Sequence, residues 1–299
     1  MDKDSVKQRF KSLNVWKSGG QRAPHKPLLI LYVLGRYQQG KERLIPYSET
    51  AKALKKMLAD FGPPRRSYRP EYPFWHLKND DIWELKNTES LRPLGPGRSP
   101  SAAELTGNNV CGGLKKEIYD AVRRDSKLLA EIAFILLEAA FPESYHADIL
   151  QAAGIDPEDH AAPGRIRDPR FREHVLRAYE YRCAVCGFNV RLGHALVALE
   201  AAHIKWHQAG GPDNETNGIA LCSMHHKLFD RGVFTLTDDL VVRVSELAHG
   251  TAGFDDWLMA FHGKRIHSPQ RQSYYPEPGF VNWHIREVFK GYARPFKDT

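Results

Sequence analysis

The chain has 299 residues, which is long enough for two domains of roughly 150 residues each. Hydrophobic residues make up 42% and charged residues 26%, so we expect ordinary globular folding. The apolar stretch 128–141 is interrupted by Glu131 and Glu138, and no run reaches the about 20 residues of a membrane helix or resembles a secretory signal. Four cysteines are too few for a disulfide scaffold. We therefore expect a cytoplasmic protein without a membrane partner, in which clustered cysteines indicate metal binding.

The charge is distributed unevenly along the chain, whose net charge is +7. Residues 1–100 hold 20 Lys and Arg against 10 Asp and Glu, residues 101–160 hold 5 against 11, and residues 161–299 hold 18 against 15. A basic first third indicates a polyanionic partner, above all nucleic acid. Charge alone is equally compatible with a solvated basic surface.

The apolar pattern predicts a mainly helical first half. Val6, Phe10 and Leu13 recur at helical spacing, and residues 27–38, 48–62, 114–124 and 127–140 have helical composition or boundaries. Residues 27–38 are apolar nearly all round, as in a core helix. Residues 63–71 and 93–101 are proline-rich loops. Residues 74–77 and 82–85, separated by four polar residues, predict an aromatic β-hairpin.

A composition change divides the chain into two expected domains. Residues 154–168 combine Gly, Pro and charge without periodicity, which is typical of a linker. We therefore expect a recognition domain at 1–153 and a second domain at 169–299, the latter opening with a helix from Pro169 to about Tyr179. Another helix is expected within residues 283–289. The predicted fold class is α+β.

Two short motifs in the second domain predict a zinc site. Cys183-x2-Cys186 and Cys222-x2-His225 each place two ligands at one tight turn, and together they offer the four N and S ligands of a tetrahedral Zn²⁺ ion. The alternative is two unrelated buried pairs. Cys111 has no partner motif and reads as an ordinary partly buried residue.

The residues around these ligands resemble the HNH endonuclease family. The sequence reads Ala-His-Ile at 202–204, Gly-Gly at 210–211, Asn-Gly-Ile-Ala-Leu-Cys at 217–222, and then Cys-x2-His-His. His203, Asn217 and His226 fall on the three signature positions. The resemblance covers about 60 residues, and it implies a ββα-metal fold stabilised by structural zinc.

The residue types at these positions suit the hydrolysis of a phosphodiester bond. An imidazole titrates near neutral pH, so His203 suits the general base, and Asn217 is expected to orient that imidazole or a nearby loop. His226 points away from the neighbouring zinc ligand on a helix, and Asp230 lies four residues later on the same face. We expect these two side chains to bind a catalytic divalent ion, either Mg²⁺, Mn²⁺ or another transition metal.

One departure from the family leaves the ligands of the catalytic ion open. Many HNH enzymes have Asp or His immediately before the base, whereas this chain has Ala202. The ion would then rely on His226, Asp230, water and phosphate, or would borrow Glu200.

Three segments of the first domain resemble the sulfur-binding domain that recognises phosphorothioate DNA. They are residues 22–29, 71–77 and 96–99. Over roughly residues 1–150 the resemblance implies a sulfur pocket, and with the HNH module it implies a phosphorothioate-dependent type IV restriction endonuclease. By that resemblance, the pocket involves His25, Lys26, Tyr72, Pro73 and His76.

The chemistry of sulfur fits such a pocket. Sulfur is larger and a poorer hydrogen-bond acceptor than oxygen, so apolar and aromatic atoms accept it while penalising oxygen. Lys26 would offer its aliphatic stem and neutralise the phosphate. The family usually has a small residue where His76 stands. Arg98 is expected to reach a base edge or the backbone, and the expected backbone contacts are Arg65, Arg66 and Arg69.

The sequence favours a bacterial defence enzyme that binds phosphorothioate double-stranded DNA and cuts nearby with a one-metal HNH mechanism. Because cutting both DNA strands would need two HNH modules, we expect a homodimer. One alternative keeps the nuclease but reads another DNA modification or unmodified DNA. The other is a non-catalytic DNA-binding protein with structural zinc, supported only by Ala202.

Overall fold

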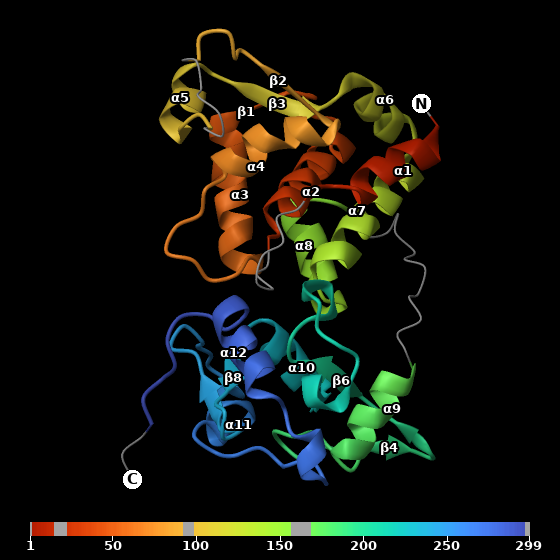
Figure 1. Cartoon of the computed structure of the whole chain (residues 1–299), viewed down its shortest axis with the longest axis vertical. Helices are drawn as coiled ribbons and strands as arrows, with labels where there is room; N and C mark the ends of the chain where they lie inside the picture. Colours follow the sequence, from red (N-terminus) through yellow and green to blue (C-terminus); the bar gives the residue numbers. More distant parts are fainter. Residues whose placement is uncertain (1, 15–22, 92–98, 157–168, 297–299) are drawn as a thin grey trace. The chain divides into compact units, whose positions relative to one another are not determined.

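The computed structural model describes residues 2–14, 23–91, 99–156 and 169–296. The chain divides into two compact units, Met1–Pro163 and Gly164–Thr299 (Figure 1). Of the linker expected at 154–168, residues 157–168 lie outside the described residues. Residues 154–156 belong to the first unit, because Ile155 is buried and the Asp156 amide donates to Gln38 Oε1 at 3.0 Å. Within the described ranges, none of the helices combines the length and the apolar character that crossing a membrane requires.

The first unit is mainly helical and is built around one buried helix. Helix α2 (His25–Gln38) buries nine residues, as its all-round apolar sequence predicts. Gly35 lets it approach the helix His146–Ala153 closely, since a Cβ there would lie 1.9 Å from the Ala153 carbonyl oxygen. The other helices of this unit are α1 (Lys3–Lys11), α3 (Tyr47–Phe61), α4 (Glu71–His76), α5 (Ala102–Gly107), α6 (Lys116–Arg124), α7 (Ser126–Ala140) and α8 (His146–Ala153).

The predicted β-hairpin is wrong. Residues 71–76 form α4, because Pro73 is tolerated in a first helical turn and the rings of Phe74 and Trp75 are buried from the helix face. Strand β2 (Trp83–Lys86) pairs instead with β3 (Cys111–Leu114), which also pairs with β1 (Ile45–Pro46). All pairs are antiparallel, and the sheet order is β1-β3-β2.

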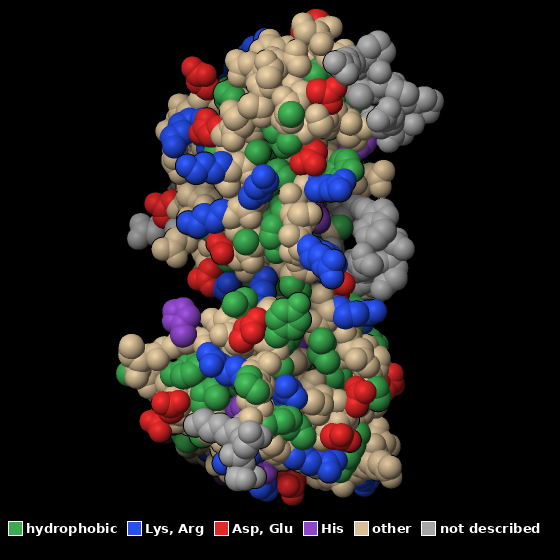
Figure 2. Space-filling view, turned by 90° about the vertical axis from the view of Figure 1, so that its left-hand side faces the viewer, with side chains coloured by type: hydrophobic (Ala, Val, Ile, Leu, Met, Phe, Trp, Pro, Cys, Tyr) green, Lys and Arg blue, Asp and Glu red, His purple; other side chains and the backbone are tan. Residues whose placement is uncertain are grey.

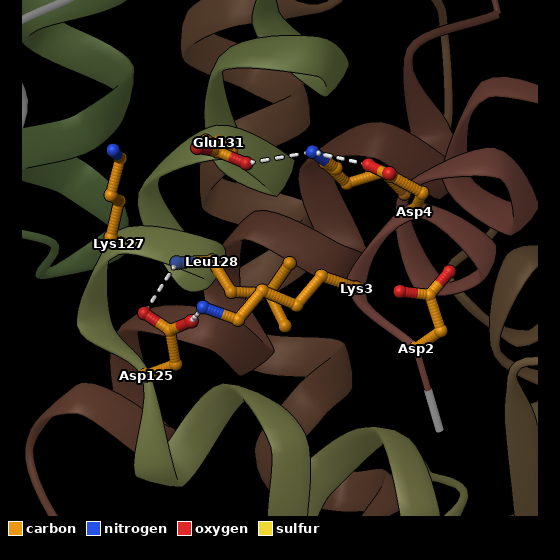
Figure 3. Close-up of a pocket in the computed structure, with 8 residues that line it drawn as sticks. Asp2, Lys3, Asp4, Asp125, Lys127, Leu128 and Glu131 are labelled. Atoms are coloured by element: carbon orange, nitrogen blue, oxygen red, sulfur yellow. Dashed lines mark hydrogen bonds and ion pairs between the residues drawn. The ribbon is translucent and has the colours of Figure 1, made fainter.

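Ion pairs attach α1 to α7 at a shallow charged pocket. Lys3 pairs with Asp125, and Lys7 contacts Asp4 at 2.8 Å and Glu131 at 3.1 Å (Figure 3). The two lysines of α1 that line this pocket are paired with carboxylates, so these ion pairs serve to join the two helices.

The second unit contains the expected ββα arrangement. Strand β6 (Leu199–His203) pairs antiparallel with β7 (Gly218–Cys222), and α10 (Ser223–Asp230) follows β7 directly. Helix α9 (Pro169–Ala178) packs against both strands. The remaining elements are β4 (Arg191–Leu192), β5 (Ala195–Leu196), β8 (Phe234–Leu236), β9 (Val242–Val244), α11 (Phe254–Trp257) and α12 (Pro278–Glu287). The α+β fold class is confirmed.

Candidate functional site

The four expected zinc ligands lie together. One ligand atom from each of Cys183, Cys186, Cys222 and His225 lies within 4.8 Å of the other three. His225 Nδ1 is 3.2 Å from Cys222 Sγ and 3.7 Å from Cys183 Sγ, and the Sγ atoms of Cys186 and Cys222 are 4.0 Å apart. Zn–S bonds of about 2.3 Å in a tetrahedron place sulfur atoms about 3.8 Å apart. The cluster therefore fits a tetrahedral ion.

Neighbouring groups prepare this cluster for a metal. His225 Nε2 donates to the Trp257 carbonyl oxygen at 2.9 Å, which leaves the Nδ1 lone pair facing the thiols. Hydrogen bonds from Cys183 and Cys186 hold the pKa of the Cys222 thiol below its ordinary value. Zinc binds a thiolate and a neutral imidazole. Burial lowers the pKa of His225, but hydrogen bonds with Cys186 and Cys222 outweigh it and raise the pKa to about 9, so zinc binding would displace the His225 proton.

The expected general base, His203, is the last residue of β6 and is partly exposed. Its Nε2 lies 2.7 Å from Asp213 Oδ1, and its ring stacks on Phe171 with centroids 4.0 Å apart and planes 12° apart. Asp213 was not foreseen from the sequence. The only signal was its place after the Gly-Gly turn, and such turn residues are common in loops.

The signature Asn217 holds a loop instead of the His203 imidazole. Its Nδ2 donates to the carbonyl oxygens of Lys205 and Pro212, both at 2.9 Å, and its Oδ1 accepts from the Lys205 amide at 2.8 Å. Asn217 is fully buried, and its three hydrogen bonds fix the loop. Of the two roles expected for Asn217, the structure has the second.

The expected catalytic-metal residues lie on one face of α10, where His226 Nε2 is 3.3 Å from Asp230 Oδ2. Glu200 on β6 approaches the opposite nitrogen, with Oε2 2.5 Å from His226 Nδ1, and also accepts from Ser223 Oγ at 2.6 Å. The Glu200 carboxylate accepts the Nδ1 proton of His226, and Nε2 faces the Asp230 carboxylate, so a divalent ion bound there would meet the Nε2 lone pair. Glu200 is therefore placed to orient His226 rather than to share one ion with it and Asp230. Ala202 is buried, paired with Ile219.

In the first unit, α4 and the N-terminus of α2 bring the expected pocket residues near one another. The Tyr72 and His76 rings lie 6.3 Å apart, and Arg69 Nη1 donates to Tyr72 Oη at 2.8 Å. Pro73 is buried, and Tyr72 is 43% exposed. His76 Nε2 lies 2.7 Å from Ser99 Oγ.

Burial keeps the two pocket histidines neutral near pH 7. Burial and then the Arg65 charge lower the pKa of His25, and burial, Lys26 and Lys78 lower that of His76. A neutral imidazole is a less polar surface than an imidazolium, so the lining is suited to a soft, weakly solvated atom.

The ammonium group of Lys26 is held inside the unit. Its Nζ donates to Asp80 Oδ2 and to the Asn14 carbonyl oxygen, both at 2.6 Å, and the Asp80 side chain is 2% exposed. This partner was not foreseen, because Asp80 lies in a polar run that the sequence places in a turn. Its carboxylate reduces the positive charge that Lys26 presents to a ligand.

The expected backbone-contact residues Arg65, Arg66 and Arg69 are all exposed. Figure 2 views the N-terminal unit from the side of α3 and α5 and shows several Lys and Arg side chains spread over that face. Exposed lysines at 52, 55 and 56 on α3 add to the charge of the unit. Arg98 lies outside the described residues.

Comparisons with known families match both halves of the chain. Residues 3–158 match the family model of the ScoMcrA-like DNA sulfur-binding domain, and residues 183–237 match that of the HNH endonuclease. None of the curated proteins compared with the chain matches it.

Solved structures resemble about half of the chain. The sulfur-binding domain of ScoMcrA complexed with phosphorothioated DNA is 24% identical, with 50% of this chain and 97% of that chain covered and a TM-score of 0.44. The sulfur-binding and SRA domains of ScoMcrA, in a complex with the same kind of DNA, are 26% identical, with 53% and 48% covered and a TM-score of 0.46. The type IV phosphorothioation-dependent restriction endonuclease ScoMcrA is 24% identical, with 52% of this chain and 35% of that chain covered and a TM-score of 0.42. The chain therefore spans about half the length of the structure with the SRA domain and about a third of the length of the restriction endonuclease ScoMcrA. Because one family model covers half of it, the chain belongs to the ScoMcrA-like DNA sulfur-binding domain family, and with its HNH domain it is a DNA endonuclease.

Proposed function

We propose that this protein is a modification-dependent restriction endonuclease that binds phosphorothioate-containing duplex DNA and cuts it nearby. One observation carries the proposal: a single chain joins a sulfur-binding family domain at 3–158 to an HNH domain at 183–237. Such DNA is what the solved ScoMcrA and SprMcrA sulfur-binding domains are complexed with.

The residues expected to contact sulfur on the first unit support this recognition. Tyr72, Pro73 and the two neutral imidazoles of His25 and His76 offer weakly polar surface, and Arg69 lies beside Tyr72. A phosphorothioate sulfur loses less hydration than an oxygen when it enters such a surface. Exposed arginines around the pocket would bind the backbone charge without reading sequence. Discrimination then comes from the lining, and affinity from the surrounding charge.

The HNH unit supports hydrolysis by one ion and one base. His203 would take a proton from the attacking water, and His226 with Asp230 would hold a divalent ion such as Mg²⁺ or Mn²⁺. When bound, that ion would stabilise charge on the scissile phosphate and the leaving oxygen. The Cys183, Cys186, Cys222 and His225 cluster would hold Zn²⁺ and fix the turn that starts α10.

Binding by a His203→Ala variant tests the reading function. Two duplexes that differ by one Rp phosphorothioate are compared at one fixed salt concentration, since backbone affinity changes steeply with salt. We expect clear preference for the sulfur duplex. Equal binding would refute sulfur reading and leave an HNH endonuclease with another target.

Metal-dependent cleavage tests the second half of the proposal. Wild-type protein with Mn²⁺ or Mg²⁺ should cut phosphorothioate plasmid DNA, and His203→Ala should bind but not cut. Cutting by His203→Ala at the wild-type rate would remove the base assignment. Absence of cutting by the wild-type protein with any divalent ion would favour a non-catalytic DNA-binding protein. Sedimentation with and without DNA tests the expected homodimer.

A further inference from the structure

Asp213, which lies outside the HNH signature, contacts a ring nitrogen of His203, the expected general base. Asp213 Oδ1 lies 2.7 Å from His203 Nε2, with 36% of the Asp213 side chain and 21% of the His203 side chain exposed. An ionised carboxylate has no proton to donate, so the hydrogen bond requires the proton on Nε2. In the neutral imidazole the other nitrogen, Nδ1, is then the basic one.

The backbone around Asp213 is fixed by the signature asparagine. Asn217 Nδ2 donates to the carbonyl oxygen of Pro212, the residue immediately before Asp213. Gly211 lies against the Lys205 carbonyl, where a Cβ would come within 1.8 Å, so the loop fits only a glycine. The Asn217 amide also donates to Asn214 Oδ1 at 3.1 Å, just after Asp213. Hydrogen bonds to the residues on either side of Asp213 therefore fix the loop next to the His203 imidazole.

A second contact fixes the plane of the same imidazole. Phe171 on α9 stacks on the ring, and the His207 ring lies 6.0 Å from it at an angle of 60°. The stack restrains tilting of the ring, and Asp213 restrains its rotation in the plane. Both contacts act on the residue that the HNH signature assigns as base, and neither comes from a signature position.

We propose that Asp213 is a positioning residue for His203: it holds the imidazole as the Nε2–H tautomer, so that Nδ1 receives the proton of the attacking water. This inference rests on the proposed nuclease function. The O–H bond of water breaks as Nδ1 takes its proton, and the oxygen bonds to phosphorus while the bond from phosphorus to the leaving oxygen breaks. The leaving oxygen takes a proton from solvent. The Asp213 carboxylate stabilises the imidazolium that results. Asn217 acts indirectly, because it fixes the loop that carries Asp213.

Kinetics with a matched control test the role of Asp213. Single-turnover cleavage of phosphorothioate plasmid DNA in Mn²⁺ is compared for wild type, Asp213→Ala, Asp213→Glu and Asp239→Ala. Asp239 is an exposed aspartate of the same unit at the turn between β8 and β9. A positioned base contributes about 10²–10⁴-fold to such steps, and Asp213 is partly solvated. We therefore expect Asp213→Ala to slow cleavage on the order of 10- to 100-fold with unchanged DNA binding. Asp213→Glu should restore part of the rate, and Asp239→Ala should behave as wild type.

The tautomer itself is measured by ¹⁵N NMR of histidine-labelled full-length protein, with the His203 signals assigned from the His203→Ala spectrum. We expect Nε2–H in the wild type and a mixture of tautomers in Asp213→Ala. Wild-type cleavage by Asp213→Ala, or an Nδ1–H tautomer in the wild-type protein, would overturn the inference. If the wild-type protein cuts no DNA at all, the proposed function fails, and the NMR result still decides whether Asp213 sets the tautomer.

Discussion

Replacing Asp80 by Asn should destabilise the first unit far more than replacing its neighbour Asp81. The Asp80 side chain is 2% exposed, with Oδ2 2.6 Å from Lys26 Nζ and Oδ1 2.7 Å from the Asn14 amide. The variant leaves the Lys26 ammonium, itself 14% exposed, without a compensating charge. Asp81 pairs with Arg9 and Lys115 but is 64% exposed.

Removing one partner of a buried ion pair costs about 3–5 kcal/mol, and Asn retains an acceptor, so we expect about 3 kcal/mol. For a unit of roughly 150 residues this corresponds to a fall in Tm of about 6–12 °C. Asp81→Asn should cost less than about 1 kcal/mol, as exposed pairs do. Because Lys26 is the damaged partner, the double variant Lys26→Met/Asp80→Asn should recover part of the loss.

Scanning calorimetry of the full chain measures both effects, and the transition of the second unit is identified by its sensitivity to a zinc chelator. If Asp80→Asn lowers the Tm of the first unit no more than Asp81→Asn, the buried pair does not hold α2 to the turn after α4. A double variant less stable than Asp80→Asn alone would also contradict the charge argument.

Three further predictions concern the metal residues and the pocket. Cys222→Ser should abolish stoichiometric zinc, measured by atomic emission, and lower the Tm of the second unit only. Glu200→Gln should weaken Mn²⁺ binding about 10- to 100-fold by calorimetry, because His226 loses the carboxylate charge that orients its ring and raises its basicity; unchanged affinity would contradict the geometry. Folding lowers the pKa values of His25 and His76 and so favours their neutral forms, hence the first unit should lose stability as pH falls below 6.5. Thermal unfolding at pH 7.5 and 5.5 checks this prediction. The first unit of a His25→Gln/His76→Gln variant should lose less stability between these two pH values than the wild type.

Local sequence signals predicted most of the helical framework. Helices α2 and α7 were expected because long apolar patterns bounded by Pro, Gly or Asp leave few alternatives. The hairpin failed because aromatic residues favour strands only where a sheet surface receives them. The true partner of β2 is Cys-Gly-Gly-Leu at 111–114, whose two glycines have low strand propensity and give no signal. Pairing between residues 25 to 31 positions apart depends on tertiary packing rather than on local preference.

The second unit was predictable at its ligands but not at its supporting contacts. Fixed spacings place Cys183, Cys186, Cys222 and His225 together, because two tight turns leave each pair little freedom. Asp213 and Glu200 act through side-chain contacts between segments 10 and 26 residues apart. Such contacts depend on loop geometry, and for Asp213 that geometry is set by Asn217.

Strand β6 connects the zinc cluster to the expected chemistry. Its first residue, Leu199, pairs with Cys222, a zinc-ligand candidate, and its last, His203, pairs with Gly218 beside Asn217. Glu200, which orients His226, lies between them on the same strand. One two-stranded ladder therefore sets the positions of the base, of the histidine expected to bind the catalytic ion, and of a cluster ligand. A two-stranded ladder is weak by itself, so the cluster must hold its Cys222 end. Loss of zinc should consequently disorder both imidazoles together, and zinc content and cutting rate should fall in parallel across variants of the cluster.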